Sequence, residues 1–279
     1  MPDSLVEAML LQTNHESKTM STLLNNKITQ FGHVKLISVR QVKSADIVYM
    51  VKEAGFDGFY IDTEHGIFSL REVSDLCMAA QSNGLIAWVR VPEARVSVVG
   101  PILDAGASGI IFPHVGTPEE AQFAVQLCKY PPHGRRSMAA LSAASLYQKK
   151  TAIELKRERE DRVDVIAMIE NALGASNADQ IAAVSGVDAL MMGPMDLSFE
   201  LGVPGQTNHA EVIAATLNSA KAAQKAGKHF VVGEAGAQLV DQLRELGAKI
   251  FTGGSDGSYL LSAMSKASAE FDAKLKTKI

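Results

Sequence analysis

The sequence predicts an α/β fold, and specifically a (β/α)8 TIM barrel. One unit recurs along the chain: a segment with the pattern of an amphipathic helix, then a glycine, then a short apolar run rich in β-branched residues. The glycine suits the left-handed residue that ends a helix, and the run suits a strand buried on both faces. Eight strands alternating with helices over about 250 residues match the size of this barrel. A doubly wound open sheet is the alternative, but no GxGxxG or GxxxxGK motif follows the first strand.

The predicted elements follow one another in regular order. Strands are expected at the ends of the units 54–62, 83–91, 105–113, 185–193, 226–233 and 246–254, and in the runs 33–39 and 162–170. Helices are expected in the segments 44–55, 70–84, 96–106, 118–130, 177–186, 209–227, 237–247 and 258–275. Parallel strands require such crossover helices between them.

Two segments fall outside this rhythm. Residues 1–30 are predicted to form a polar N-terminal arm or a capping helix, and residues 31–279 the barrel. The segment 130–160 is too long for an ordinary connection and is predicted to be an inserted loop. Loops of that length in compact domains tend to be functional or to form oligomer contacts.

Composition excludes several classes of protein. The net charge of −4 gives no basic surface for a nucleic acid, although a local positive site could still bind a small anion. No apolar run approaches the 18 residues of a membrane span, and no secretory-signal pattern is present, so no membrane partner is expected. Cys77 and Cys128 have neither zinc nor disulfide spacing and are expected to be buried free thiols. The cytoplasm is the expected location.

Charged side chains follow seven of the eight predicted strands. Catalytic groups of this fold lie at the carboxyl ends of the strands, so these residues are candidates for an active site. After the second strand come Asp62, Glu64 and His65; the third to eighth strands are followed, in order, by Arg90, His114, Glu170, Asp196, Glu234 and Asp256.

Glu170 and Asp196 are candidate metal ligands. Glu170 ends an apolar strand, and a buried carboxylate must be paired, protonated or bound to a metal. Asp196 follows the neighbouring strand, close enough to share an ion. Two carboxylates without cysteines favour a hard divalent ion such as Mg²⁺ or Mn²⁺. The alternative is a pair of helix-capping or salt-bridged acids.

Arg90 and His65 each have two interpretations. Arg90 ends the run WVRV, where a planar two-pronged donor suits a carboxylate or enolate oxygen. Its alternative is an ion pair with an acid of the rim. His65 follows two acids and could be a general base whose tautomer a carboxylate fixes. Its alternative, which His114 shares, is a solvated loop histidine.

Six separated motifs resemble, in order, those of the HpcH/HpaI aldolase family, the class II metal-dependent pyruvate aldolases. They are IDTEHG, WVRV, LDAGASGIIFP, YPPHGRR, the IE of AMIEN, and GPMDLS, and they cover roughly residues 30–265. The PHV after the fourth strand and the GRRS of the long loop look more like the macrophomate synthase branch. The bacterial aldolases have an apolar residue where His114 stands, so this departure leaves the second substrate open.

The resemblance implies how substrate and metal are held. Glu170 and Asp196 would bind a divalent ion, Mg²⁺ or else Mn²⁺ or Co²⁺, which would chelate a small 2-oxo acid. Arg90 would hold the keto oxygen and stabilise the enolate. The backbone at Gly193, Pro194 and Met195 would receive the substrate carboxylate. Acceptor specificity is expected to depend on His114, together with Arg135, Arg136 and Tyr147.

The resemblance also implies a shared acid–base site. His65 would be the acid/base, with Asp62 and Glu64 ordering it, and its partner would be Asp104 of the LDAG motif. Asp104 ends a helix just before the fourth strand, at the opposite end of the barrel from His65. The two can meet only across a subunit boundary. We therefore expect a homo-oligomer, by resemblance a hexamer built as a trimer of dimers.

Three functions remain open. The first is a metal-dependent aldolase that cleaves 4-hydroxy-2-oxo acids to pyruvate and an aldehyde through the pyruvate enolate, without a lysine Schiff base. The second is oxaloacetate decarboxylation, as in a macrophomate-synthase-like enzyme, which passes through the same enolate. The third is a non-catalytic metabolite-binding barrel, against which the joint presence of Glu170, Asp196, Arg90 and His65 argues.

Overall fold

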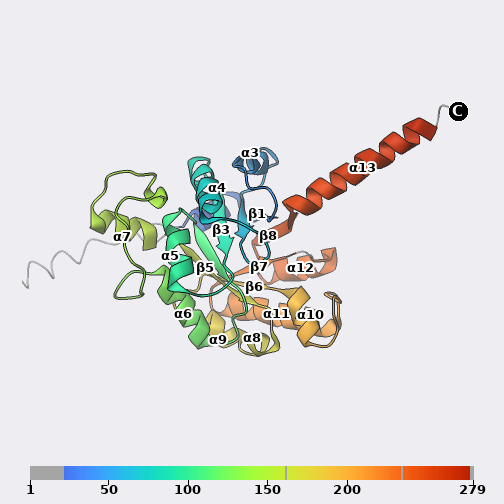
Figure 1. The fold of residues 1–279 in the computed structure, drawn as a ribbon. Helices are drawn as coiled ribbons and strands as arrows, with labels where there is room; N and C mark the ends of the chain where they lie inside the picture. The colour runs from blue at the N-terminus through green and yellow to red at the C-terminus, as the bar shows by residue number, and fades with distance from the viewer. Residues whose placement is uncertain (1–21, 161, 234, 277–279) are drawn as a thin grey trace, which may run out of the picture.

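The computed structural model describes residues 22–160, 162–233 and 235–276. Its eight parallel strands pair in chain order, and the first pairs with the last, which closes a barrel (Figure 1). The predicted (β/α)8 fold is confirmed. In the described part of the chain, no helix is both long and apolar enough to cross a membrane.

The barrel strands are β1 (Val34–Val39), β2 (Gly58–Asp62), β3 (Ile86–Arg90), β4 (Gly109–Phe112), β5 (Asp164–Ile169), β6 (Ala189–Met192), β7 (His229–Val232) and β8 (Ile250–Ser255). The helices are α2 (Leu23–Phe31), α3 (Asp46–Glu53), α4 (Leu70–Ser82), α5 (Val96–Asp104), α6 (Pro118–Cys128), α7 (Ala152–Glu160), α8 (Ala172–Ser176), α9 (Ala178–Ala182), α10 (Pro194–Glu200), α11 (Ala210–Lys225), α12 (Ala237–Glu245) and α13 (Asp256–Lys276). A 3₁₀ turn, η2, spans Ala143–Ser145.

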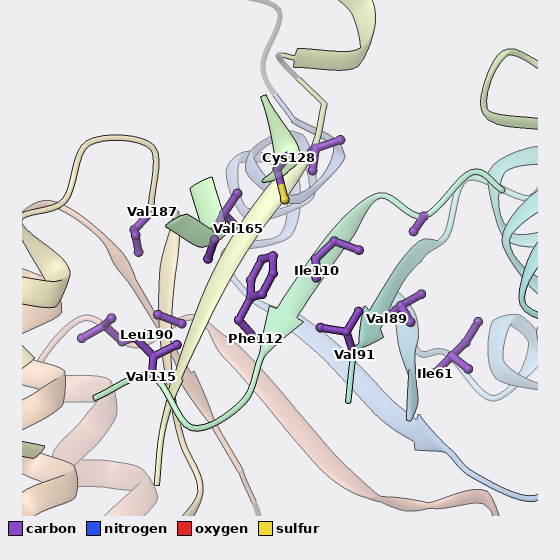
Figure 2. Packing of buried hydrophobic residues seen from close by; sticks show 14 of the residues in the cluster. Ile61, Val89, Val91, Ile110, Phe112, Val115, Cys128, Val165, Val187 and Leu190 are labelled. Atoms are coloured by element: carbon purple, nitrogen blue, oxygen red, sulfur yellow. The ribbon is translucent and has the colours of Figure 1, made fainter. Parts of the chain in front are cut away.

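The strands are apolar because both of their faces are buried. One set of side chains fills the barrel interior. A second, larger set packs between the strands and the surrounding helices, and Figure 2 shows part of this second set. Trp88 of β3 is the largest fully buried side chain. Gly109 makes room for it on β4, because a Cβ there would lie 2.5 Å from the Trp88 ring. Alternation of large and small residues thus lets the interior fill.

Side-chain caps fix where two of the outer helices begin. Ser69 and Glu72 form a reciprocal capping box at the start of α4, and Thr117 and Glu120 form another at the start of α6. Each box satisfies backbone N–H groups that the first helical turn leaves unpaired. α4 is the first helix after β2, and α6 is the first helix after β4. The caps therefore also set where the two intervening loops at the barrel mouth end.

Three segments differ from the sequence predictions. The helix expected at 177–186 is shorter, α9 (Ala178–Ala182), and a further short helix, α8 (Ala172–Ser176), precedes it. The segment 130–160, predicted as a loop, contains α7 and η2, and α10 follows β6 directly. Within the predicted arm, α2 inserts Leu24 and Ile28 into the cluster of the barrel interior; residues 1–21 lie outside the described part. The last helix, α13, projects away from the barrel (Figure 1).

Candidate active site

A buried ion pair joins the ends of β2 and β3. Arg90 donates from Nε to Asp62 Oδ1 at 3.0 Å and from Nη2 to Oδ2 at 2.5 Å. Arg40, directly after β1, places its Nε 2.8 Å from Oδ2 of the same carboxylate. Burial acts to raise the pKa of Asp62, but the hydrogen bonds and charges of these arginines hold it below the usual value. Asp62 is therefore an anion, and Arg90 is fixed in one orientation.

Glu64, His114 and Glu170 converge beside this pair. His114 Nε2 lies 3.1 Å from Glu64 Oε1, and His114 Nδ1 lies 3.1 Å from Glu170 Oε1. The backbone N–H of His114 also donates to Glu170 Oε1, at 2.7 Å. Glu64 in turn contacts Arg90 Nη1 through its Oε2 at 3.1 Å. The ends of four neighbouring strands, β2 to β5, thus bring Asp62, Glu64, Arg90, His114 and Glu170 to one corner of the mouth.

Glu170 is the most confined of these groups. It is 1 % exposed, and its Oε2 has no hydrogen-bond partner among the described residues. Burial raises its pKa to about 7; His114 opposes the rise, and the charges of Glu64 and Asp196 add to it. A Cβ on Gly193 would lie 2.5 Å from Glu170 Oε2. A glycine at position 193 therefore leaves room for Glu170 Oε2, which any larger side chain would displace.

The arrangement fits a divalent metal ion. Glu64, His114 and Glu170 each offer one ligand atom, and these atoms lie within 4.8 Å of one another. The partnerless Oε2 of Glu170 is a buried acceptor that a cation would satisfy. Carboxylate oxygens are the donors that Mg²⁺ and Mn²⁺ prefer, and a neutral imidazole is compatible with Mn²⁺ or Co²⁺.

The two predicted metal ligands differ in their exposure to solvent. Glu170 is buried, whereas Asp196 is exposed in the first turn of α10. They remain close enough for the charge of Asp196 to raise the pKa of Glu170. The three-residue cluster contains His114 and Glu64 in place of Asp196.

His65 lies at the edge of the cluster. Its side chain is 57 % exposed, and its Nε2 is 4.0 Å from Glu64 Oε2. Asp62 was expected to order the ring, but its carboxylate accepts the backbone N–H of His65, at 3.1 Å. Asp62 therefore fixes the loop that carries the histidine, and the ring itself faces outward.

The stretch Gly193, Pro194 and Met195 connects β6 to α10 beside Glu170. The Gly193 N–H donates to Ile169 O at 2.9 Å, so this N–H is already used within the barrel. Pro194 has no N–H. Of the three, only Met195, which is 52 % exposed, keeps a backbone N–H that could face a substrate.

Comparison with known proteins identifies the family. The family described as HpcH/HpaI aldolase/citrate lyase matches residues 41–263. This chain belongs to the HpcH/HpaI family. It is 39 % identical over 226 residues to the 4-hydroxy-4-methyl-2-oxoglutarate aldolase of Hapsidospora irregularis, covering 80 % of this chain and 83 % of that one.

Solved structures agree with the HpcH/HpaI assignment. An HpcH/HpaI aldolase from Desulfitobacterium hafniense superposes with a TM-score of 0.83 at 32 % identity, covering 90 % of this chain and 97 % of that one. Macrophomate synthase superposes with a TM-score of 0.75 at 28 % identity, covering 91 % and 89 %. The similarity to both, predicted from the motifs, is confirmed.

Asp104 of this HpcH/HpaI chain lies far from the mouth in its own barrel. It ends α5, just before β4 begins, and its Oδ1 lies 3.1 Å from Arg136 Nη2. Arg136, expected near the acceptor, is buried at this same lower end. Within one chain, neither residue joins the mouth cluster.

Asp256, the charged residue predicted after the last strand, has a structural role. Its carboxylate accepts the backbone N–H groups of Arg40, Gln41 and Val42, at 2.7–3.0 Å. It therefore orders the loop after β1. Glu234 lies outside the described residues.

Arg40 is the site residue that the sequence reasoning missed. It ends the one strand for which no charged end was noted, although the text VKLISVR places it directly after the apolar run. Its ion pair with Asp62 gives that carboxylate a second cation. The same rule that selected Arg90, a cation ending an apolar run, would have found it.

Proposed function

We propose that this protein is a divalent-metal-dependent aldolase that cleaves 4-hydroxy-2-oxo acids to pyruvate and an aldehyde. The observation that carries the proposal is the buried, partnerless Glu170 oxygen next to the Arg90–Asp62 pair at the barrel mouth. The family supports it, as does the relative named a 4-hydroxy-4-methyl-2-oxoglutarate aldolase. Such a reaction leaves negative charge on a pyruvate enolate, which the Arg90 guanidinium and a metal ion held by the mouth carboxylates would stabilise.

The carboxylates of the mouth would hold the metal. We assign Glu170 and Asp196 as its protein ligands, with Glu64 and His114 lying close enough to contribute. When bound, a divalent ion would lower the energy of negative charge on the 2-oxo acid. Mg²⁺ is our first choice, because carboxylate oxygens dominate the set, and Mn²⁺ or Co²⁺ suits a site that includes imidazole.

The chain's own residues would position the substrate and move the proton. Arg90 has Nε and Nη2 committed to Asp62, and this leaves Nη1, which faces Glu64, to hold the keto oxygen. A fixed donor costs no reorganisation as charge develops. His65, exposed at the rim, would take the proton from the 4-hydroxyl group. The substrate carboxylate would lie against the Gly193–Met195 backbone, where Met195 offers its N–H.

We also propose a homo-oligomer with shared sites, a hexamer by resemblance. Asp104 can reach a His65 ring only from another chain. The support is α13, whose side chains from residue 258 to residue 275 are all exposed. Along it, Leu260, Met264, Phe271 and Leu275 recur on one face and are 56–72 % exposed. A second copy would bury this stripe. We place the enzyme in the cytoplasm, in keeping with two free buried cysteines.

Oxaloacetate decarboxylation is the second candidate function. It passes through the same enolate. The observation that favours it is His114, which belongs to the PHV motif that resembles the macrophomate synthase branch and lies between Glu64 and Glu170. A non-catalytic metabolite-binding barrel is a third and remote candidate.

A product assay separates these functions. The purified chain is incubated with oxaloacetate and with a panel of 4-hydroxy-2-oxo acids, and pyruvate, aldehyde and CO₂ are measured. Aldehyde formation that stops on chelation and returns with Mg²⁺, Mn²⁺ or Co²⁺ supports the aldolase; release of CO₂ alone supports the decarboxylase. Activity that survives exhaustive chelation would refute the metal-dependent mechanism.

A further inference from the structure

A cavity of about 310 Å³ lies at the end of the barrel opposite the mouth; we call it the basal cavity. Its walls include residues just before β3, β4 and β5, namely Leu85, Ala107 and Val163. The inserted segment 130–160 supplies another part of the wall through Arg136, Ala144 and Leu155. Volumes of this size are at the lower end of those that hold small organic ligands.

Two buried arginines line the basal cavity with unused donors. Arg136 is 5 % exposed, and its Nε and Nη1 have no hydrogen-bond partner among the described residues. Arg159 is 6 % exposed, and its Nε likewise has none. Buried cationic N–H groups are costly to leave unpaired, so their presence at a cavity wall points to an acceptor that fills it.

The remaining contacts of these arginines hold the guanidinium groups in place. Arg136 Nη2 binds Asp104, and its guanidinium lies 4.9 Å from the centre of the Tyr130 ring. Arg159 donates from Nη1 to Ala139 O at 2.7 Å and from Nη2 to Ser142 Oγ at 3.1 Å. The unused nitrogens are therefore fixed in position before any ligand arrives, which lowers the entropy cost of binding.

The charge and polarity of the lining define the ligand. The charged lining residues are Arg136, Arg159, the exposed Arg162 and one acid, Glu158, whose two oxygens already bind Lys150 Nζ at 2.9 and 2.6 Å. The positive charge is thus in excess. Most other lining residues are apolar, including Leu85, Leu103, Leu155 and Val163. An anionic head with an apolar body matches this surface.

We propose that the basal cavity binds a small organic anion, whose oxyanion end accepts hydrogen bonds from Arg136 and Arg159 and whose apolar body lies among the leucines. Its head is a carboxylate or a phosphate, both of which match the planar fork of arginine. Within one chain the site is separate from the mouth cluster, because its walls belong to the opposite ends of the strands. Its ligand would join the inserted segment to the barrel base.

Calorimetric titration of the full chain tests the proposal. The probes are acetate, hexanoate, inorganic phosphate and butyl phosphate, each titrated in the presence of chelator. We expect the two probes with alkyl bodies to bind at least tenfold more tightly than acetate and inorganic phosphate. Tighter binding of hexanoate than of butyl phosphate identifies a carboxylate head, and the reverse order a phosphate head.

Matched variants locate the binding. Arg136→Gln and Arg159→Gln should each weaken binding at least tenfold, whereas Arg135→Gln, the exposed neighbour that does not line the cavity, should leave it unchanged. Ala144→Leu keeps both arginines and fills the space of the apolar body, so it should abolish the preference for the longer probes. Thermal melts verify that each variant is folded. No binding of any probe at millimolar concentration, or unchanged affinity in either glutamine variant, overturns the proposal.

Discussion

Asp62 and Arg90 stand opposite one another at the ends of β2 and β3, and two hydrogen bonds of 3.0 and 2.5 Å join them. Both side chains are buried, so the pair has little freedom. The sheet register places them side by side, and Arg40 adds a second cation to the carboxylate. The mouth is thereby built around a fixed anion and a fixed guanidinium fork.

Replacement of Arg90 by lysine should slow turnover without loss of metal. A lysine cannot make both contacts to Asp62, so the cation is no longer held in one place. We expect kcat to fall about 100-fold, the size of effect seen when one preorganised donor is removed. Metal affinity, measured by calorimetry, should change little. Arg95→Lys is the control, since Arg95 is exposed and its side chain pairs with Glu93, away from the site. Weakened metal binding in Arg90→Lys would contradict this assignment.

A methyl group at Gly193 should disable the metal site. Its Cβ would lie 2.5 Å from Glu170 Oε2 and 2.6 Å from Glu170 Cβ, which forces the carboxylate to move. Gly193→Ala should therefore weaken Mn²⁺ binding at least tenfold and reduce pyruvate formation in parallel. Gly233→Ala, at the end of β7, is the matched control, because its Cβ meets nothing closer than Thr252 Oγ1 at 4.0 Å. Equal metal affinity in the two variants would show that Glu170 does not need this space.

Asp164 should make the chain less stable as the pH rises. Burial, and then the charge of Asp188, raise its pKa to about 7, against the opposing effects of Trp88, Thr22 and Lys129. The folded state holds this proton up to about pH 7, whereas the unfolded chain loses it near pH 4. The stabilisation is therefore complete below about pH 4 and is lost as the pH rises to 7, by an amount on the order of 2–4 kcal/mol.

Urea denaturation at pH 5 and pH 8 measures this effect. In Asp164→Asn the residue can still accept the Trp88 N–H but no longer titrates, so the decline in unfolding free energy should be smaller than in the unaltered chain. Titrating groups that do not interact with Asp164 contribute equally to both proteins. Identical declines would mean that Asp164 is ionised in the folded state at both pH values.

Mixed oligomers test the shared site. His65→Ala and Asp104→Ala chains should each be inactive. After mixing and reassembly, about a quarter of the sites should combine an intact histidine with an intact aspartate from a neighbour, if exchange is random. Recovery of about that fraction of activity supports the shared site. Absence of recovery, with subunit exchange verified by mass spectrometry, would rule it out.

Charges on the apolar stripe of α13 should weaken assembly. Met264 and Phe271 are 58 % and 65 % exposed and lie on one face. Met264→Glu combined with Phe271→Glu should lower the molar mass measured by light scattering, because an interface cannot bury unpaired carboxylates cheaply. Ser262→Glu, on the opposite face of the helix, is the control. An unchanged molar mass in the double variant would remove α13 from the interface.

The fold was predictable from sequence because every strand is an apolar run and every strand except β5 has a glycine shortly before it. The helices that were missed have local reasons. α7 reads AIELKRERE and has no apolar stripe; Leu155 and Arg159 alone among its described side chains are buried. Asn177 separates α8 from α9, and its Nδ2 donates to the distant Gly116 O at 2.8 Å. A contact of that range leaves no periodic signal.

The sequence was enough to predict which residues lie at the mouth, but it was not enough to predict which of them contact one another. Arg90 could face a ligand or an acid, and only the strand register shows that it faces Asp62. His114 adopts a φ of 56°, in the left-handed region that non-glycine residues seldom occupy, and this turn aims its ring between two carboxylates. The residue types next to His114 do not predict that backbone conformation.

Asp256 links α13 to the loop after β1, where the barrel closes. The first residue of α13 binds three successive amides after β1, where the first and last strands meet. One of those amides belongs to Arg40, whose side chain pairs with Asp62. The root of the projecting helix and the charge balance of the mouth therefore rest on a single carboxylate, so a force that tilts α13 is transmitted within two residues to the reacting end of the barrel.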